Sequence, residues 1–261
     1  WVAVVQTARA QWSGARTERW SVQITDLLTG HVLLARTPDR MLSTASLAKV
    51  FVLAELARAT SVGTVALAEI LDRRHVDDVG GCGVWRHMDT DHLTVADLAV
   101  LVGRVSDNLA TNALIERLGL KAIQNVAARL APRGSMIHDL VRDTRHASHP
   151  PAFSTGCASD WCQALAGIHD QFPAVFDWMA DGAMDPACVT GTPITMVNKT
   201  GMDAGVYCDA GLIFGPERAV TYAILCNWDS TERPSTALAC SSAYRRLVEA
   251  YARGLGAPHT V

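Results

Sequence analysis

The spacing of apolar residues predicts strands near both ends of the chain and helices between them. Apolar and β-branched residues fill 21–24 and 31–35, and the turn-forming pair Thr29-Gly30 separates the two runs. This arrangement indicates a β-hairpin. Later in the chain, three more apolar runs are expected to form consecutive antiparallel strands, at residues 194–198, 206–214 and 220–227.

Between these strands, apolar residues recur with the period of a helix. Residues 44–60 are rich in Ala and Leu, and Ser43 or Thr44 could cap them. Thr94 and Asp97 have the spacing of a capping box, which predicts that another helix begins there. The other predicted helices are 107–118 with Gly119 as a left-handed cap, a stretch reaching about Leu130, 158–169 and 241–253.

This order of elements predicts an α/β fold, an α+β sandwich in which helices flank an antiparallel sheet. Residues 1–42 and 170–261 would form an α/β lobe from both chain ends. Residues 43–169 would form an inserted all-helical lobe. The active-site cleft is expected between the two lobes. Proline and polar residues between Pro132 and Pro151 indicate an irregular loop in the inserted part.

Composition narrows the range of partners. The chain has 261 residues, 49% of them apolar and 19% charged, as in an ordinary globular protein. A formal charge of −3 gives no electrostatic reason to expect nucleic acid or an anionic membrane as a partner. No apolar run is long enough to span a membrane. A small-molecule or peptide-like substrate fits better, and we expect a monomer.

The cysteines bear on the cellular setting. Their count is seven, an odd number, and no Cys-x-x-Cys pair occurs among them. This usage favours a reduced, cytoplasmic setting. The chain begins at Trp1, so a secreted mature form is the alternative, and the localisation stays unknown.

Three short motifs carry the candidate chemistry: Ser46-Leu47-Ala48-Lys49, Ser106-Asp107-Asn108 and Lys199-Thr200-Gly201. Residues three apart share a helix face, so the amine of Lys49 can reach the hydroxyl of Ser46. Burial and a second cation such as Lys199 would favour the neutral amine that a general base requires. Only three lysines occur in the chain, and two of them belong to these motifs. Taken singly, each motif has an ordinary explanation, such as an exposed helical lysine or a helix cap.

Together the motifs resemble those of the class A β-lactamases and penicillin-binding proteins, which are serine hydrolases. The similarity extends to 94–98 and 109–112 and covers nearly the whole chain from about Ser21 to Arg253. It implies a β-lactamase/transpeptidase-like fold and a covalent acyl-enzyme formed on an amide, β-lactam or ester carbonyl. No cofactor is expected.

The resemblance also implies a role for each motif residue. Ser46 would be the nucleophile and Lys49 the base, while Ser106 with Lys199 would help the leaving group depart. Asn108 would bind Lys49 and a substrate amide. The remaining substrate-binding positions are Thr200, Gly201 and Met202, and the backbone N–H groups of Ser46 and Met202 would form the oxyanion hole.

The chain departs from the family where deacylation is expected. Class A enzymes carry a water-activating glutamate in their omega loop, but no glutamate occurs between Glu116 and Glu217. The stretch 138–152 is too short for the usual loop. Asp139 and Asp143 are the nearest carboxylates and are candidates for water activation. The alternative is that both only cap the backbone or pair with neighbouring arginines.

Substrate recognition departs from the family as well. No arginine occurs between Arg145 and Arg218, and Cys208 lies near the position that often pairs with a β-lactam carboxylate, so the anion clamp is weakened. Trp85 could provide an aromatic wall, although a core position is the stronger expectation for a lone aromatic residue. Cys82 is expected to be a small buried residue.

No metal or nucleotide site is predicted. His146-x-x-His149 lies in a proline-bearing loop and lacks the glutamate and helical spacing of a zinc motif. The Asn198-Lys199-Thr200 glycosylation pattern is interpreted as coincidental because it overlaps the third motif.

The sequence therefore favours a serine hydrolase or acyltransferase with weak or absent β-lactam hydrolysis. One alternative is a binding or sensor protein that is acylated once with little turnover. A second is a biosynthetic transacylase that passes the acyl group to an amine or alcohol. A third is a degenerate, purely structural domain.

Overall fold

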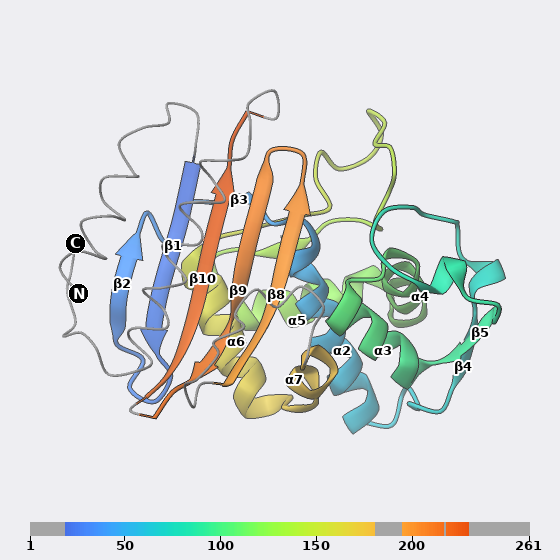
Figure 1. The fold of residues 1–261 in the computed structure, drawn as a ribbon, viewed down its shortest axis with the longest axis horizontal. Coiled ribbons are helices and arrows are strands. Elements are labelled where there is room, and N and C mark those ends of the chain that lie inside the picture. Colours follow the sequence, from blue (N-terminus) through green and yellow to red (C-terminus); the bar gives the residue numbers. More distant parts are fainter. Residues whose placement is uncertain (1–18, 181–194, 217, 230–261) are drawn as a thin grey trace.

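The computed structural model describes residues 19–180, 195–216 and 218–229. Its main sheet has five antiparallel strands in the order β2-β1-β10-β9-β8 (Figure 1). The strands are β1 (Arg19–Asp26), β2 (Val32–Arg36), β8 (Thr195–Asp203), β9 (Val206–Phe214) and β10 (Ala219–Asn227). Since β1 pairs with β10, the sheet joins an early segment of the chain to a late one. This confirms the predicted fold class.

The first hairpin forms where the turn residues predict it. The carboxylate of Asp26 accepts hydrogen bonds from the backbone N–H groups of Leu28 and Thr29. Gly30 follows with a φ of +72°, a conformation that glycine adopts without steric cost. The turn is therefore closed by local interactions that the sequence already contains.

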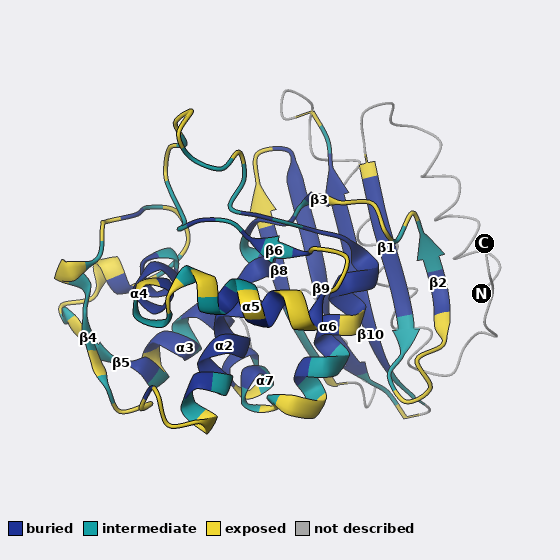
Figure 2. Ribbon diagram, turned by 180° about the vertical axis from the view of Figure 1, so that it is seen from behind, coloured by how far each residue is buried: buried dark blue, intermediate teal, exposed yellow. Residues whose placement is uncertain are grey.

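Six α-helices lie in the described part of the chain beside or behind the sheet. They are α2 (Lys49–Ser61), α3 (Val95–Val105), α4 (Asn108–Leu118), α5 (Leu120–Leu130), α6 (Ala158–Gln171) and α7 (Ala174–Met179). Helix α2 contacts α3, α4, α5 and α7, whereas α6 packs on β10, β1 and β9 (Figures 1 and 2). The division of the chain into two lobes stays a prediction. No described helix has both the length and the apolar character required to cross a membrane.

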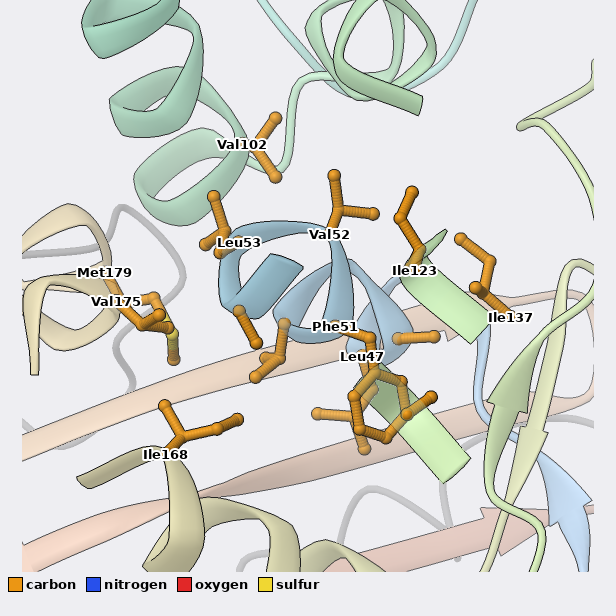
Figure 3. Close-up of a cluster of buried hydrophobic side chains, with 14 of the residues drawn as sticks. Leu47, Phe51, Val52, Leu53, Val102, Ile123, Ile137, Ile168, Val175 and Met179 are labelled. Atoms are coloured by element: carbon orange, nitrogen blue, oxygen red, sulfur yellow. The ribbon is translucent and has the colours of Figure 1, made fainter. Parts of the chain in front are cut away.

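Helix α2 is at the centre of the hydrophobic core. Ten of its 13 residues are buried, and Figure 3 shows Phe51, Val52 and Leu53 surrounded by apolar side chains of other elements. The Phe51 ring stacks on Trp161 of α6 with 4.6 Å between ring centroids. A helix that is buried on nearly every side is fixed by packing. Residues at its N-terminus are therefore held in place.

Several short elements were not predicted, because segments of two to six residues carry little periodic signal. They are the helix α7, the 3₁₀ segments η2 (Arg73–His75) and η3 (Trp85–His87), and the strands β3 (Leu42–Ser43), β4 (Ile70–Asp72), β5 (His92–Thr94), β6 (Met136–Ile137) and β7 (Ser154–Gly156). The 3₁₀ segment η1 (Ala45–Ala48) lies within the predicted helix 44–60 and forms its first turn. Strands β3, β7 and β6 form a small second sheet, and β4 pairs with β5.

Helix ends test the capping predictions. The box of Thr94 and Asp97 forms as predicted at the start of α3. The predicted cap by Ser43 or Thr44 is wrong, because the helix is preceded by η1 and the Thr44 hydroxyl contacts Ser154 instead. Gly119 ends α4 as predicted, but the predicted left-handed conformation is wrong: its φ is +83° and its ψ is extended, since α5 begins at the next residue. The predicted helix 241–253 lies outside the described residues.

Candidate active site

Ser46 lies in η1, directly before α2, and is half-buried. Strand β8 passes beside it at Gly201. A Cβ atom on Gly201 would lie 2.3 Å from the Thr44 carbonyl oxygen and 3.2 Å from the Ser46 nitrogen. Only glycine allows this approach of two backbones. The first and third motifs therefore meet at the backbone of residue 46.

Lys49 joins the first motif to the second. Its side chain is completely buried, and its Nζ donates to the Ser106 carbonyl oxygen at 2.7 Å and the Ser106 Oγ at 3.2 Å. A third bond of 2.7 Å reaches the Asn108 Oδ1. None of these three bonds goes to Ser46. The neutral oxygen partners satisfy the amine without adding a carboxylate that would hold its proton.

The backbone at Ser106 makes these contacts possible. Ser106 has a φ of +57° and ψ of 36°, the left-handed conformation, and it ends α3 immediately before α4 begins. This sharp reversal brings the Ser106 carbonyl, the Ser106 hydroxyl and the Asn108 amide toward one point. That point is occupied by the Lys49 amine.

Burial controls the charge of both motif lysines. It lowers the pKa of Lys49 well below its usual range, and the positive charge of Lys199 lowers that pKa further. Burial also lowers the pKa of Lys199 to about 8. The neutral amine of Lys49 is therefore accessible at a lower pH than for an exposed lysine, as a general base requires.

The third motif lies on β8, an edge strand of the main sheet. Lys199 and Thr200 are buried, and the Lys199 Nζ donates to the Thr200 carbonyl oxygen at 2.9 Å. Met202 is 54% exposed. The edge position leaves one side of β8 without a partner strand among the described residues, next to η1.

Asp107 has a role that the sequence analysis did not assign. Its carboxylate is buried and accepts hydrogen bonds from the backbone N–H groups of Val84 and Trp85, at 2.7 and 2.8 Å. Its other oxygen caps α4 through Ala110 N. The segment 80–85 is thereby fixed on the second motif, which Asn108 supports by donating to the Gly80 carbonyl oxygen at 2.7 Å.

Trp85 is buried, whereas Cys82 is exposed. Trp85 is fully buried in the core, which is the stronger of the two expectations from sequence, so its indole does not line a binding surface. The prediction that Cys82 is buried is wrong, because its side chain is exposed. Its backbone carbonyl accepts from Asn108 N, and this bond fixes the backbone beside the second motif. Cys208 is buried on β9, and its Sγ donates to the Ser43 carbonyl oxygen of β3.

The two candidate carboxylates are already engaged. Asp139 pairs with Arg142 and Arg145, at 2.7 and 2.9 Å. Although burial opposes it, hydrogen bonds from these arginines and from the Leu140 N–H lower the pKa of Asp139 to about 2. Asp143 accepts from the Gly80 N–H. These contacts match the capping and pairing alternative for both residues. For Asp139 the low pKa also argues against water activation, because such a carboxylate is a weak base.

Asn112 positions the loop that follows, and the sequence analysis did not assign it this role. It lies one helical turn beyond Asn108 on α4, where i and i+4 residues share a face. Its side chain donates to the Val141 carbonyl oxygen at 2.9 Å and accepts from the Val141 N–H at 2.8 Å. A cavity of about 220 Å³ lies between this loop, Asn112 and Asp77–Val79.

Among the described residues, no three histidine, cysteine, aspartate or glutamate side chains converge in a way that could hold a metal ion. The rings of His146 and His149 lie 5.4 Å apart, and the backbone N–H of His146 donates to the His149 ring. This local contact accounts for the pair.

The fold and the convergence of the three motifs define a β-lactamase/transpeptidase-like protein. The chain belongs to the β-lactamase enzyme family, whose model matches residues 5–251. It is thus a serine enzyme of that family, as the motifs indicate. No curated protein matches the chain.

Solved structures show the same fold at low sequence identity. A β-lactamase from Sphaerobacter thermophilus has a TM-score of 0.83 and 24% identity, with 99% of each chain covered. PBP-A has a TM-score of 0.79 and 20% identity, with 95% of this chain and 96% of that chain covered. A class A β-lactamase from Mycobacterium abscessus has a TM-score of 0.77 and 18% identity, with 95% and 99% covered. These similarities confirm the fold.

Proposed function

We propose that the protein forms a covalent acyl-enzyme at Ser46 with β-lactams or related acyl donors. The observation that carries this proposal is the position of Lys49. Its buried amine is tied to Ser106 and Asn108, and its pKa is lowered by burial. A PBP-A variant that shares the fold was solved as an acyl-enzyme complex with penicillin G (TM-score 0.78, 20% identity, 96% of each chain covered).

In the proposed acylation, the neutral Lys49 amine takes the proton of the Ser46 hydroxyl while the Ser46 Oγ bonds to the carbonyl carbon. Negative charge develops on the carbonyl oxygen, which accepts hydrogen bonds from the backbone N–H groups of Ser46 and Met202. The proton then passes through Ser106 to the leaving nitrogen, and the C–N bond breaks. Lys199 supplies positive charge beside this transfer, and the acyl group stays on Ser46 as an ester.

We infer that release of the acyl group by water is slow. No glutamate occurs between Glu116 and Glu217, so the shortened loop carries no carboxylate of the class A kind. Asp139 is held by two arginines, and Asp143 is held by the Gly80 N–H. Val141 is the loop residue that Asn112 holds near the second motif, and it has no acid–base group. A long-lived acyl-enzyme and weak β-lactam hydrolysis follow from this set of residues.

A transacylase is the second candidate function. Slow hydrolysis favours it, because an amine or alcohol acceptor could then compete with water for the ester on Ser46. Met202, on the edge strand β8, is exposed and follows directly on the buried Gly201 beside the nucleophile, so an acceptor could approach there. If neither water nor another acceptor removes the acyl group, the protein would be acylated only once and could act as a sensor.

Intact-mass spectrometry tests these proposals directly. The protein is mixed with a panel of penicillins, D-alanyl peptides and simple esters, and the mass is followed from seconds to hours. We expect a stoichiometric adduct that is absent in Ser46→Ala and present in the control Ser21→Ala, which alters a buried serine of β1 outside the three motifs. Lack of any adduct would contradict the acyl-enzyme, and adduct loss within seconds would contradict slow hydrolysis. Faster loss on adding an amine would support the transacylase.

A further inference from the structure

The turn immediately before Ser46 has an uncommon backbone conformation. Ala45 has a φ of +44°, a value that residues with a Cβ rarely adopt. Ala45 is buried at the start of η1. Such a conformation persists only where the surrounding structure holds it in place. The contacts that hold Ala45 therefore also determine how the next residue, the proposed nucleophile, is presented.

One hydroxyl from the small sheet contributes two of these contacts, beside the backbone bond of 3.3 Å from the Thr44 N–H to the Ser154 carbonyl oxygen. The Ser154 Oγ on β7 donates to the Ala45 carbonyl oxygen at 2.9 Å. The same Oγ lies 2.7 Å from the Thr44 Oγ1. Because the one proton of Ser154 is used on Ala45, Thr44 must be the donor in the second contact. The resulting chain runs from the Thr44 hydroxyl to the Ser154 hydroxyl to the Ala45 carbonyl, and Thr44 and Ser154 are both fully buried.

Peptide geometry transmits this contact to Ser46. The carbonyl oxygen of Ala45 and the N–H of Ser46 belong to one planar peptide unit. No cis peptide bond occurs in the described residues, so the two groups point in opposite directions. Fixing the oxygen therefore fixes the N–H. The Ser46 nitrogen lies against β8, 3.2 Å from where a Cβ on Gly201 would be.

We propose that Ser154 is a positioning residue for the reaction at Ser46. Its hydroxyl holds the Ala45 carbonyl and thereby sets the direction of the Ser46 N–H, which is one of the two proposed oxyanion donors. This inference rests on the proposed acyl-enzyme. It goes further by assigning the orientation of an oxyanion donor to a residue that lies 109 positions from Ala45 and acts only through the Ala45 carbonyl.

The test separates positioning from general stability. In Ser154→Ala, the first-order acylation rate constant should fall about 10- to 100-fold, less than the 10²- to 10³-fold expected for removing an oxyanion donor outright. Affinity for the acyl donor, measured in the Ser46→Ala background, should be unchanged. Ser154→Thr keeps a hydroxyl and should restore most of the rate. Thr44→Val removes only the outer donor and should give a smaller loss in the same direction.

A matched pair of substrates reports on the oxyanion itself. An activated ester is compared with its thiono counterpart, in which sulfur replaces the carbonyl oxygen. Sulfur accepts the oxyanion hydrogen bonds poorly, so the wild type should prefer the oxygen ester. In Ser154→Ala, the ratio of the two acylation rates should fall by the same factor as the acylation rate with the oxygen ester. A defect that is only structural would slow both substrates equally.

Ser21→Ala provides the control, because the Ser21 hydroxyl is also fully buried and also makes two hydrogen bonds, to Pro38 O and from Ala158 N. It should lower the urea midpoint about as much as Ser154→Ala does. The preference for the oxygen ester over the thiono ester should stay as in the wild type. Equal preference in Ser154→Ala and Ser21→Ala would overturn the role of Ser154. If the wild type forms no adduct at all, the acyl-enzyme proposal has failed first, and the two failures are thus told apart.

Discussion

Replacing Asp107 with Asn should both destabilise the protein and impair acylation. The Asp107 carboxylate is 1% exposed and accepts three backbone N–H bonds, of 2.7, 2.8 and 2.9 Å. Asn has nearly the same shape but only one acceptor oxygen. One oxygen can face the Val84 and Trp85 amides or it can cap α4, but it cannot do both.

The expected loss in the free energy of unfolding follows from counting these hydrogen bonds. In the less costly orientation, the amide oxygen serves Val84 and Trp85, and the Ala110 N–H loses its acceptor. An unsatisfied buried donor costs about 1–3 kcal/mol, and loss of charge assistance on the other two bonds costs about 1 kcal/mol each. The neutral amide avoids the desolvation of a buried carboxylate, which offsets part of this sum. We expect a net loss of about 2–4 kcal/mol in the free energy of unfolding.

Urea unfolding measures this loss as a shift of the midpoint, provided that the dependence of the unfolding free energy on urea concentration is unchanged. Since small domains unfold with about 5–15 kcal/mol, the variant should remain folded in buffer, so its acylation rate can be measured. We expect a slower rate, because Asn108, which contacts both Lys49 and Gly80, directly follows the altered residue. Asp203→Asn serves as the control, since that exposed side chain accepts from the neighbouring Ala204 N–H. An Asp107→Asn midpoint equal to the control would refute the reasoning.

Three further predictions concern the reaction. Lys49→Ala should lower the acylation rate by at least about 10²-fold, the usual contribution of a general base, and an unchanged rate by stopped-flow would contradict the proposed role. The rate should rise with pH as Lys49 loses its proton and fall as Lys199 loses its proton near its pKa of about 8. Lys199→Arg should move that alkaline limb upward, and a limb that stays in place would assign it to another group. Val141→Glu should shorten the adduct lifetime at least about tenfold in a mass-spectrometric time course, because it adds a carboxylate at the loop position whose backbone Asn112 holds. Val141→Gln is its uncharged control, and equal lifetimes would argue against the loop position.

Features that depend on neighbouring residues were predictable from the sequence. The hairpin turn at Asp26 and the capping box of Thr94 and Asp97 form through hydrogen bonds that span two or three residues. The buried strands and helices follow from periodicity, which requires only a local run of apolar residues. The order and spacing of the three motifs carried the family resemblance, which the family comparison confirms.

The surroundings of single side chains depend on partners that are distant in sequence, so the sequence did not determine them. Sequence left Asp139 open between catalysis and pairing, and the positions of Arg142 and Arg145 favour pairing. Cys82 was expected to be buried, but the segment 80–85 is turned by its bonds to Asp107 and Asn108, which leave that side chain exposed. No periodic pattern carries such information.

The sequence by itself determined which reactive groups the protein owns: a serine and a lysine one helical turn apart, a second serine, a second lysine, and no loop glutamate. Tertiary structure alone decided what those groups can do. It buried Lys49 against Ser106 and Asn108, 57 and 59 residues away, and it placed the Ser154 hydroxyl on the turn before Ser46. The physical reason is that proton affinity and hydrogen-bond direction depend on the surroundings of a group in space, which residue spacing along the chain does not specify.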